Sequence, residues 1–403
     1  MKTTKQILVK NTLWLTTLEV FSKIIMFFVT VSVVRYFGAE DFGRLNYAQS
    51  FVGICMLLSD FGLNTILIRD ISGDKQHASS YLTSALVLKG VSSLLVLLVL
   101  LLIAPVDLGL FLLVALFLLT VSTSAIYTAV LSAYESMQYI FATRLVHYLG
   151  ILASVLLVIQ FHLDLHSLVL FYFLSALLSV FVAIYFLSRL GVSLISPFDQ
   201  GLTKKLLLQS LPIFGMLAIN QVYLNLDTVM IRHSFSAIEV GYYQAAYKIL
   251  FAFQAINLVA TATFPRISAL YHEGDIVKLK KLAKLVILGM SAIFIPFIGL
   301  IYLFSPLLVK LIYGASYLPA SPVLPVLLTA GLLMFYRTFI SNYFLAANKE
   351  RLVLRAALFG LVVNTFLNYF LIPRYGFTLA GISLVISEIM ILLSLLGQQY
   401  LCR

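Results

Sequence analysis

Charged residues inside long apolar stretches are the first candidates for chemistry in this 403-residue chain. A charge inside apolar surroundings is costly, so it usually pairs with another group or faces a water-filled cavity. The cations would line a cavity that attracts an anion, and the carboxylates would bind a coupling cation or a proton. The candidates are the four cations Lys248, Arg337, Lys23 and Lys89 and the four carboxylates Asp60, Asp227, Glu19 and Glu388.

The N-terminal candidates also have structural interpretations. Glu19 and Lys23 lie four residues apart, in the order that favours an ion pair on a helix, so they either neutralise each other or line a cavity. Lys89 lies near the start of a predicted helix, where a long side chain can reach the membrane surface. Asp60 precedes Gly62, which can break a helix there, so its carboxylate either binds a cation or caps and packs the helix end.

The C-terminal candidates allow two partnerships. Asp227 and Lys248 lie on consecutive apolar segments, so they either pair or leave Lys248 facing an anion. Arg337 lies in the middle of an apolar segment and stays charged, so it must meet an anion, a carboxylate or water. Glu388 has no partner near it in the sequence, and Arg337 is the candidate partner.

The composition places these charges in a membrane protein. The chain is 62% hydrophobic and 11% charged, whereas soluble domains contain about 25% charged residues. The lipid bilayer is therefore its predicted solvent, and the net charge of +11 indicates cytoplasmic loops and anionic headgroups or substrates, not nucleic acid. The two cysteines, Cys55 and Cys402, do not suggest a disulfide framework, and their spacing supports no metal site.

Continuous apolar runs of about 20 residues predict an all-α polytopic protein with about twelve spanning helices. A polar connector at 191–205 divides the chain into predicted six-helix bundles at 1–190 and 206–403. The predicted spans are 12–34, 44–68, 80–104, 108–131, 138–161, 166–188, 206–231, 240–264, 283–304, 321–345, 351–372 and 376–397.

The loops between these spans alternate in charge. With both termini on one side, that side carries 18 Lys and Arg residues and the other carries 5. Because basic loops stay in the cytoplasm, both termini are predicted to be cytoplasmic, and an even number of spans is favoured.

The halves of the chain resemble each other. Residues 225–248 repeat the pattern of residues 34–50, and Gly241 matches Gly43 at an offset of 198. Six predicted helices separate the copies, so the halves would share one orientation about an axis along the membrane normal.

The charges of the second copy are not repeated. Asp227 aligns with Thr30, and Lys248 aligns with Ser50. The turn and its glycine are therefore interpreted as architecture, whereas Asp227 and Lys248 remain candidates for function.

Four short segments carry a resemblance to a known family. They are RYFGAEDFG at 35–43, SDFGL at 59–63, EVGYYQAAYK at 239–248 and FPRIS at 264–268. With the twelve-span, two-times-six pattern they resemble the polysaccharide transporters of the multidrug/oligosaccharidyl-lipid/polysaccharide (MOP) flippase superfamily, whose fold is MATE-like. The resemblance extends over almost the whole chain.

This resemblance implies a Wzx-type flippase of the bacterial cytoplasmic membrane. It would move undecaprenyl-diphosphate-linked O-antigen, capsule or exopolysaccharide repeat units by alternating access around a cationic cavity. No cofactor is expected, and an ion or proton gradient or consumption of the product would supply the energy. A polysaccharide polymerase and a chain-length regulator are the implied protein partners.

Other functions stay open at this level. A MATE-like drug or cation antiporter would favour an acidic cavity, whereas four cations and four carboxylates balance here. A membrane polysaccharide polymerase or glycosyltransferase would usually show a large, Arg-bearing loop, which no predicted loop here resembles. The chain also has no Walker A, H-E-x-x-H or Gly-rich dinucleotide sequence, so a transporter is favoured over an enzyme.

Overall fold

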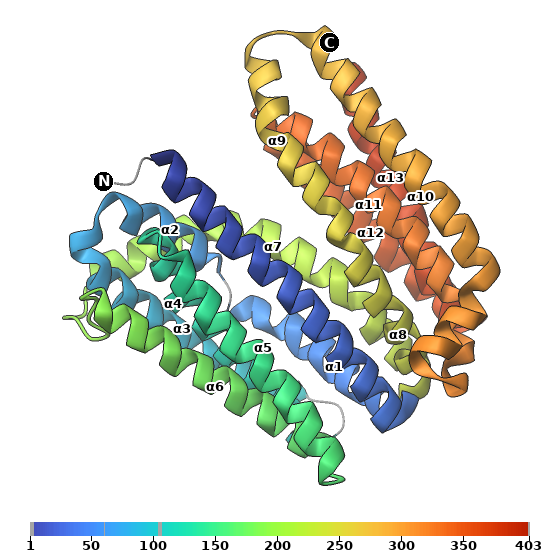
Figure 1. The fold of residues 1–403 in the computed structure, drawn as a ribbon, viewed down its shortest axis with the longest axis horizontal. Coiled ribbons are helices and arrows are strands. Elements are labelled where there is room, and N and C mark those ends of the chain that lie inside the picture. The colour runs from blue at the N-terminus through green and yellow to red at the C-terminus, as the bar shows by residue number, and fades with distance from the viewer. Residues whose placement is uncertain (1–3, 60, 104–106, 402–403) are drawn as a thin grey trace. The chain divides into compact units, whose positions relative to one another are not determined.

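The computed structural model describes residues 4–59, 61–103 and 107–401, and every regular element in these ranges is a helix (Figure 1). A bilayer offers the backbone no hydrogen-bond partners, so continuous apolar runs satisfy their amides within helices. The α-helices are α1 (Thr4–Cys55), α2 (Leu63–Gly73), α3 (Ala78–Ile103), α4 (Leu108–Ala133), α5 (Met137–Gln160), α6 (Leu165–Arg189), α7 (Gln200–Ser234), α8 (Ala237–Phe253), α9 (Asn257–His272), α10 (Ile276–Tyr313), α11 (Val323–Ala346), α12 (Glu350–Tyr375) and α13 (Thr378–Leu401).

The predicted all-α polytopic fold is confirmed. In the described part of the chain, nine helices are long and apolar enough to span a bilayer, or ten when the two arms of α7, which meet at 53°, count as one span. Helices α2, α8 and α9 have 11, 17 and 16 residues and are too short to qualify alone. The count of twelve spans therefore stays a prediction.

The second predicted span of each half is interrupted. In the first half, the short 3-10 turn Met56–Leu58 ends α1, and Gly62 (φ 75°) precedes α2, so the break predicted at this glycine is confirmed. In the second half, the 3-10 turn Gln254–Ile256 separates α8 from α9, 198 residues later. Within α1, Gly38 (φ 73°, ψ −175°) turns the chain between the first two predicted spans. Positive φ favours glycine because a side chain would clash with the backbone.

The chain forms two compact units whose boundaries cross the predicted bundles. The N-terminal unit comprises Met1–Tyr36 and Ala48–Gln221, and the C-terminal unit comprises Phe37–Tyr47 and Val222–Arg403. Helix α7 contributes to both units, and the short segment around Gly43 belongs to the C-terminal unit.

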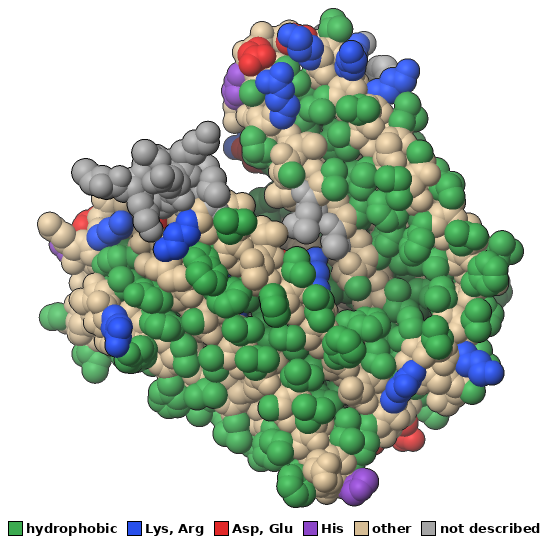
Figure 2. All heavy atoms as spheres, viewed as in Figure 1, with side chains coloured by type: hydrophobic (Ala, Val, Ile, Leu, Met, Phe, Trp, Pro, Cys, Tyr) green, Lys and Arg blue, Asp and Glu red, His purple; other side chains and the backbone are tan. Residues whose placement is uncertain are grey.

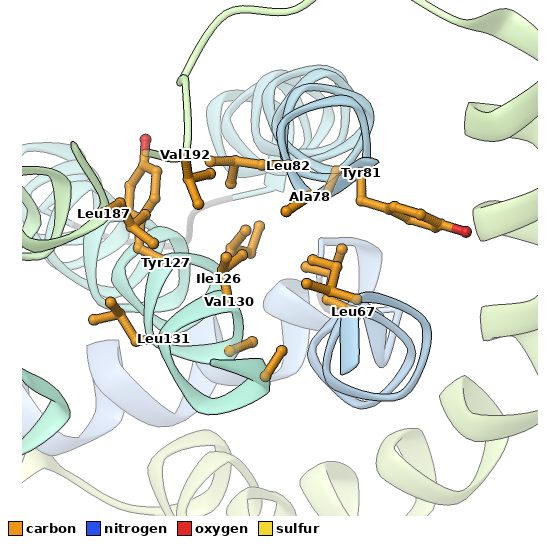
Figure 3. Packing of buried hydrophobic residues seen from close by; sticks show 14 of the residues in the cluster. Leu67, Ala78, Tyr81, Leu82, Ile126, Tyr127, Val130, Leu131, Leu187 and Val192 are labelled. Atoms are coloured by element: carbon orange, nitrogen blue, oxygen red, sulfur yellow. The ribbon is translucent and has the colours of Figure 1, made fainter. Parts of the chain in front are cut away.

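The N-terminal unit packs around α4, which lies against α2, α3 and α6, while α5 lies against α6 (Figure 1). Buried aliphatic side chains from several helices fill its core, including Leu67 of α2, Leu82 of α3, Val130 of α4 and Leu187 of α6 (Figure 3). This core supplies the apolar contact that helices need after insertion.

The connector between α6 and α7 is held to α3. The Ser193 amide donates to Ser79 Oγ (2.9 Å), and the Ser196 amide donates to Thr83 Oγ1 (3.0 Å). Val192 is buried in the core that Figure 3 shows. The connector is therefore fixed to the N-terminal unit by backbone bonds and packing.

Two matched glycines allow a close backbone approach inside the C-terminal unit. A Cβ atom on Gly43 would lie 1.7 Å from the Ala237 carbonyl oxygen, and one on Gly241 would lie 2.0 Å from the Ala39 carbonyl oxygen. The turn regions of the two repeats thus pack reciprocally, and only glycine fits at either position.

Candidate functional site

Asp227 of α7 lies at the centre of a buried polar network. Tyr243 of α8 donates a hydrogen bond to Asp227 Oδ2 (2.8 Å), and Asn368 of α12 donates to Asp227 Oδ1 (2.6 Å). The Asn368 amide also donates to Asn364 Oδ1 (3.1 Å). All four side chains are at most 3% exposed, so the carboxylate is isolated from bulk solvent.

The oxygen atoms of this network suit a small hard cation or a proton. A buried carboxylate is costly unless it is paired, protonated or bound to a cation. Asp227 has no ion-pair partner among the described residues, and Asn364 Nδ2 and Asn368 Oδ1 have no hydrogen-bond partner there. Carboxylate and amide oxygens are the ligands that hard cations prefer.

A second network joins α7, α11 and α13. Tyr223 donates a hydrogen bond to Glu388 Oε1 (2.8 Å), and Arg337 Nε lies 3.0 Å from Glu388 Oε2. The latter contact is an ion pair whose angle does not satisfy hydrogen-bond geometry. The Arg337 guanidinium also lies 5.8 Å from the Tyr223 ring centroid. The partnership predicted for Glu388 and Arg337 is thus present.

The two networks are neighbours on α7. Tyr223 and Asp227 are four residues apart and therefore share one helix face. Glu388 is fully buried, whereas a quarter of the Arg337 side chain is exposed. Arg337 lines a pocket of about 230 Å³ between α11, α12 and α13, together with Ser341 and Asn342. The Arg337 guanidinium contacts a buried carboxylate on one side and lines a polar pocket on the other. In this position it can bind an anionic group in the pocket.

Lys248 lies in α8, one helical turn beyond Gln244, and is half-buried. Its ammonium has no hydrogen-bond or ion-pair partner in the part of the chain that the structure describes. The alternative in which it pairs with Asp227 is therefore wrong, and the charge of Lys248 is not compensated by a described neighbour.

The N-terminal candidates are separated from one another. Glu19 is exposed and Lys23 is half-buried on α1, and the ion pair that their spacing allowed is not formed between these two described side chains. Asp60 lies outside the described residues.

Lys89 differs most from its prediction. It lies in the middle of α3 and is only 2% exposed, so its side chain is buried among other helices and does not extend to the surface of the protein. Its ammonium donates to the Ser59 carbonyl oxygen (3.3 Å) and to Ser122 Oγ (2.5 Å). A cation there meets the negative end of the helix that stops before Gly62, so Lys89 stabilises the break in the second span.

Sequence reasoning did not single out four participants in the two networks. They are Tyr223, Tyr243, Asn364 and Asn368. A usable signal exists in α12, where Asn364 and Asn368 are four residues apart in an apolar helix and so share one face.

Comparisons with known proteins agree with this fold. The family described as "Polysaccharide biosynthesis protein" matches residues 8–271, and the family MatE matches residues 212–370. The capsular polysaccharide biosynthesis protein CapF of Staphylococcus aureus is 20% identical over 96% of this chain and 98% of its own. A Haloferax volcanii protein described as "Probable low-salt glycan biosynthesis flippase Agl15" is 23% identical over 88% of this chain and 75% of its own.

Solved structures share the fold at low identity. The lipid II flippase MurJ in an inward closed conformation has a TM-score of 0.80 and 16% identity, covering 96% of this chain and 87% of its own. An inward-facing MATE family transporter has a TM-score of 0.71 and 14% identity, covering 94% of each chain. The family match extends over more than half of the sequence, so the chain belongs to the polysaccharide biosynthesis protein family of the MOP flippase superfamily.

Proposed function

We propose that this protein is a flippase that moves undecaprenyl-diphosphate-linked oligosaccharide repeat units across a bacterial cytoplasmic membrane by alternating access. The relatives named for capsular polysaccharide and glycan biosynthesis support a lipid-linked glycan as the cargo. The observation that carries the proposal is Arg337, a partly exposed guanidinium inside a spanning helix, held by a buried carboxylate beside a pocket.

The diphosphate is the part of this cargo that the cations would recognise. Arg337 presents a planar set of donors that suits phosphate oxygens, and Lys248 adds a charge that no described side chain neutralises. Lys23 is half-buried and remains a further candidate. The Lys89 ammonium already bonds Ser59 and Ser122, which favours a role inside the N-terminal unit.

Asp227 is the proposed site of a coupling cation or proton. Its carboxylate accepts two hydrogen bonds and has no cationic partner among the described side chains. A bound cation or proton would therefore neutralise its charge. Glu388 suits this role less because Arg337 already compensates its charge. Glu19 is exposed on α1 and suits it least.

Transport of a fluorescent lipid-diphosphate oligosaccharide in proteoliposomes tests the proposal. Arg337→Ala and Lys248→Ala should each lower the flipping rate at least tenfold, because about 1.4 kcal/mol of lost binding corresponds to tenfold. Arg337→Lys and Lys248→Arg should recover part of the rate. Arg355→Ala, which removes an exposed charge from α12, is the matched control and should leave the rate unchanged. Normal flipping in both alanine variants would refute the cationic contact.

Asp227→Asn separates coupling from binding. This variant should still bind the lipid-linked glycan but should lose any dependence of the flipping rate on an imposed sodium or proton gradient. If the gradient accelerates wild type and Asp227→Asn equally, Asp227 is not the coupling site.

A drug or cation antiporter is the second candidate. The isolated Asp227 carboxylate and the MatE match over 212–370 favour it. Uptake of an organic cation that depends on Asp227, together with no glycan flipping, would support this alternative.

A further inference from the structure

A separate pocket of about 420 Å³ lies in the C-terminal unit between α9, α10, α11 and α13. Its walls are largely apolar, and Tyr343 is a polar exception. Side chains from all four helices contribute, including Ile267, Leu279, Ala283, Phe339, Phe344 and Leu396. These walls suit a hydrocarbon chain better than a sugar or a free ion.

This pocket lies on a different face of α11 from the Arg337 site. Its α11 residues are Phe339, Ile340, Tyr343 and Phe344, whereas Arg337 lines the smaller pocket together with Ser341 and Asn342. Residues four apart share a helix face and residues two apart do not, so α11 separates the two pockets.

Two lysines also line the larger pocket. Lys280 lies one turn into α10 and Lys349 lies in the turn between α11 and α12. Neither ammonium has an ion-pair or hydrogen-bond partner among the described side chains, whereas the nearby Lys278 pairs with Asp275 at 2.8 Å. No carboxylate is among the lining residues.

The surrounding surface is rich in basic side chains. Lys and Arg side chains gather at the end of the unit where α9 turns into α10, and acidic side chains lie among them (Figure 2). Clusters of basic residues at the ends of spanning helices are typical of the membrane surface, where a ligand can place an apolar chain among the helices and its headgroup at the lysines.

We propose that this pocket binds an anionic phospholipid of the bilayer, with an acyl chain between α10 and α11 and the phosphate between Lys280 and Lys349. The apolar walls disfavour a free anion. The two uncompensated cations, without a lining carboxylate, disfavour a zwitterionic lipid. This proposal is independent of the proposed transport function. Its test measures lipid binding and does not require the protein to transport a substrate.

The test places a fluorescent reporter in the pocket. Trp14 is the chain's single tryptophan, so Trp14→Phe with Tyr343→Trp gives one emitter beside the lysines, and Ile340→Trp gives a second version. The full-length variant is placed in phosphatidylcholine vesicles that contain dibrominated phosphatidylglycerol or dibrominated phosphatidylcholine. Each lysine near an anionic headgroup contributes about fivefold in affinity, so phosphatidylglycerol should quench at a mole fraction at least fivefold lower.

Paired variants separate the site from general surface charge. Lys280→Gln with Lys349→Gln should abolish the preference for phosphatidylglycerol. Lys281→Gln with Arg351→Gln removes the same charge from the same end, and neither residue lines the pocket, so the preference should remain. An equal loss in both pairs would overturn the proposal.

A filling variant tests the acyl chain. Ala283→Phe should protect the reporter from both brominated lipids, whereas Ala292→Phe, on the exposed side of α10, should not. Unchanged quenching in Ala283→Phe would show that no chain enters the pocket. Displacement of brominated phosphatidylglycerol by a far lower mole fraction of lipid-diphosphate oligosaccharide would assign the pocket to that lipid and refute the proposal.

Discussion

The two halves of the chain share a backbone pattern but bury different chemistry. Each half has a glycine at the matched turn position and an interruption in its second predicted span. In the first half, the interruption is held by a cation, Lys89, through the Ser59 carbonyl and the Ser122 hydroxyl. In the second half, the buried charges include a carboxylate, Asp227, that accepts hydrogen bonds from a tyrosine and an asparagine.

This difference separates architecture from function. A helix turn or break depends on backbone conformation and on small residues, so both copies retain it. Burying a charge inside the membrane costs free energy, so a buried charged residue usually has a compensating partner or a role in function. The proposed coupling chemistry at Asp227 is therefore expected to belong to the second copy alone.

The largest predicted effect concerns the glycines that the copies share. Gly43→Val and Gly241→Val place side-chain atoms against the backbone oxygens of Ala237 and Ala39, which no change of side-chain conformation can relieve. Both variants should lose the monodisperse folded peak in detergent size-exclusion chromatography. Gly289→Val, whose Cβ meets nothing within 4 Å, is the control. Normal folding of both test variants would contradict the claim that the two halves share a glycine-dependent backbone contact.

The second-largest effect is expected for the ion pair between Arg337 and Glu388 in the second half. Arg337→Ala leaves the fully buried Glu388 carboxylate uncompensated, and breaking a buried pair costs about 3 kcal/mol or more in the free energy of unfolding. Thermal unfolding of Arg337→Ala, Glu388→Ala and the double variant forms a double-mutant cycle. The double variant should be more stable than the sum of the single losses implies, by about 1–3 kcal/mol. Additive losses would show that the two side chains do not act as a pair.

The cation of the first half should have a smaller effect. Lys89→Met keeps most of the volume but removes the hydrogen bonds to Ser59 and Ser122, at a cost of about 1.5–3 kcal/mol. The unfolding temperature should fall, and Ser122→Ala should lower it less. Lys23→Met, which removes a half-buried lysine from α1, is the control. A null result for Lys89→Met would show that the first-half break does not need its cation.

The smallest effect concerns helix N-caps outside the membrane, which the halves share. Hydrogen bonds from the Ser167 hydroxyl and amide lower the pKa of Asp164 below its ordinary value of 3.8, and the hydrogen bond from Lys278 does the same for Asp275. A lowered carboxyl pKa stabilises the fold above pH 3.8, and this contribution is lost as the pH falls through the lowered pKa. Both carboxylates are solvent-accessible, so screening keeps the effect small.

The unfolding temperatures of wild type, Asp164→Asn and Asp275→Asn between pH 7 and pH 3 measure this contribution. Each Asn variant keeps a cap and should lie on the order of 1 °C below wild type at pH 7. The difference should close as the pH falls below 3.8. A difference that persists at pH 3 would assign the effect to packing instead of charge.

Much of the backbone was predictable because apolar length determines where a helix can cross a bilayer. The predicted span 108–131 compares with Leu108–Ala133, and the break at Gly62 was expected from glycine alone. The contact between Glu388 and Arg337 was also anticipated, because each needed a partner and few charges were available.

The local surroundings of the site could not be predicted in the same way. Sequence spacing shows which residues share a helix face but not which helix that face contacts. The sequence therefore suggested Lys248 as a partner of Asp227, whereas the structure shows Asn368. Lys89 was expected to reach the surface, yet its depth depends on the break beside Ser59 and on Ser122 of α4. Such contacts arise from tertiary packing across helices.

The placement of Phe37–Tyr47 in the C-terminal unit has a consequence for biosynthesis. The backbone around Ala237 that receives Gly43 is synthesised about 190 residues later, which at 5–20 residues per second is a delay of roughly 10–40 s. During that interval the first two membrane segments are inserted without their final neighbour. A nascent chain arrested before Ala237 should therefore expose the Gly43 face to insertion chaperones and membrane proteases, and one arrested after Gly241 should be protected.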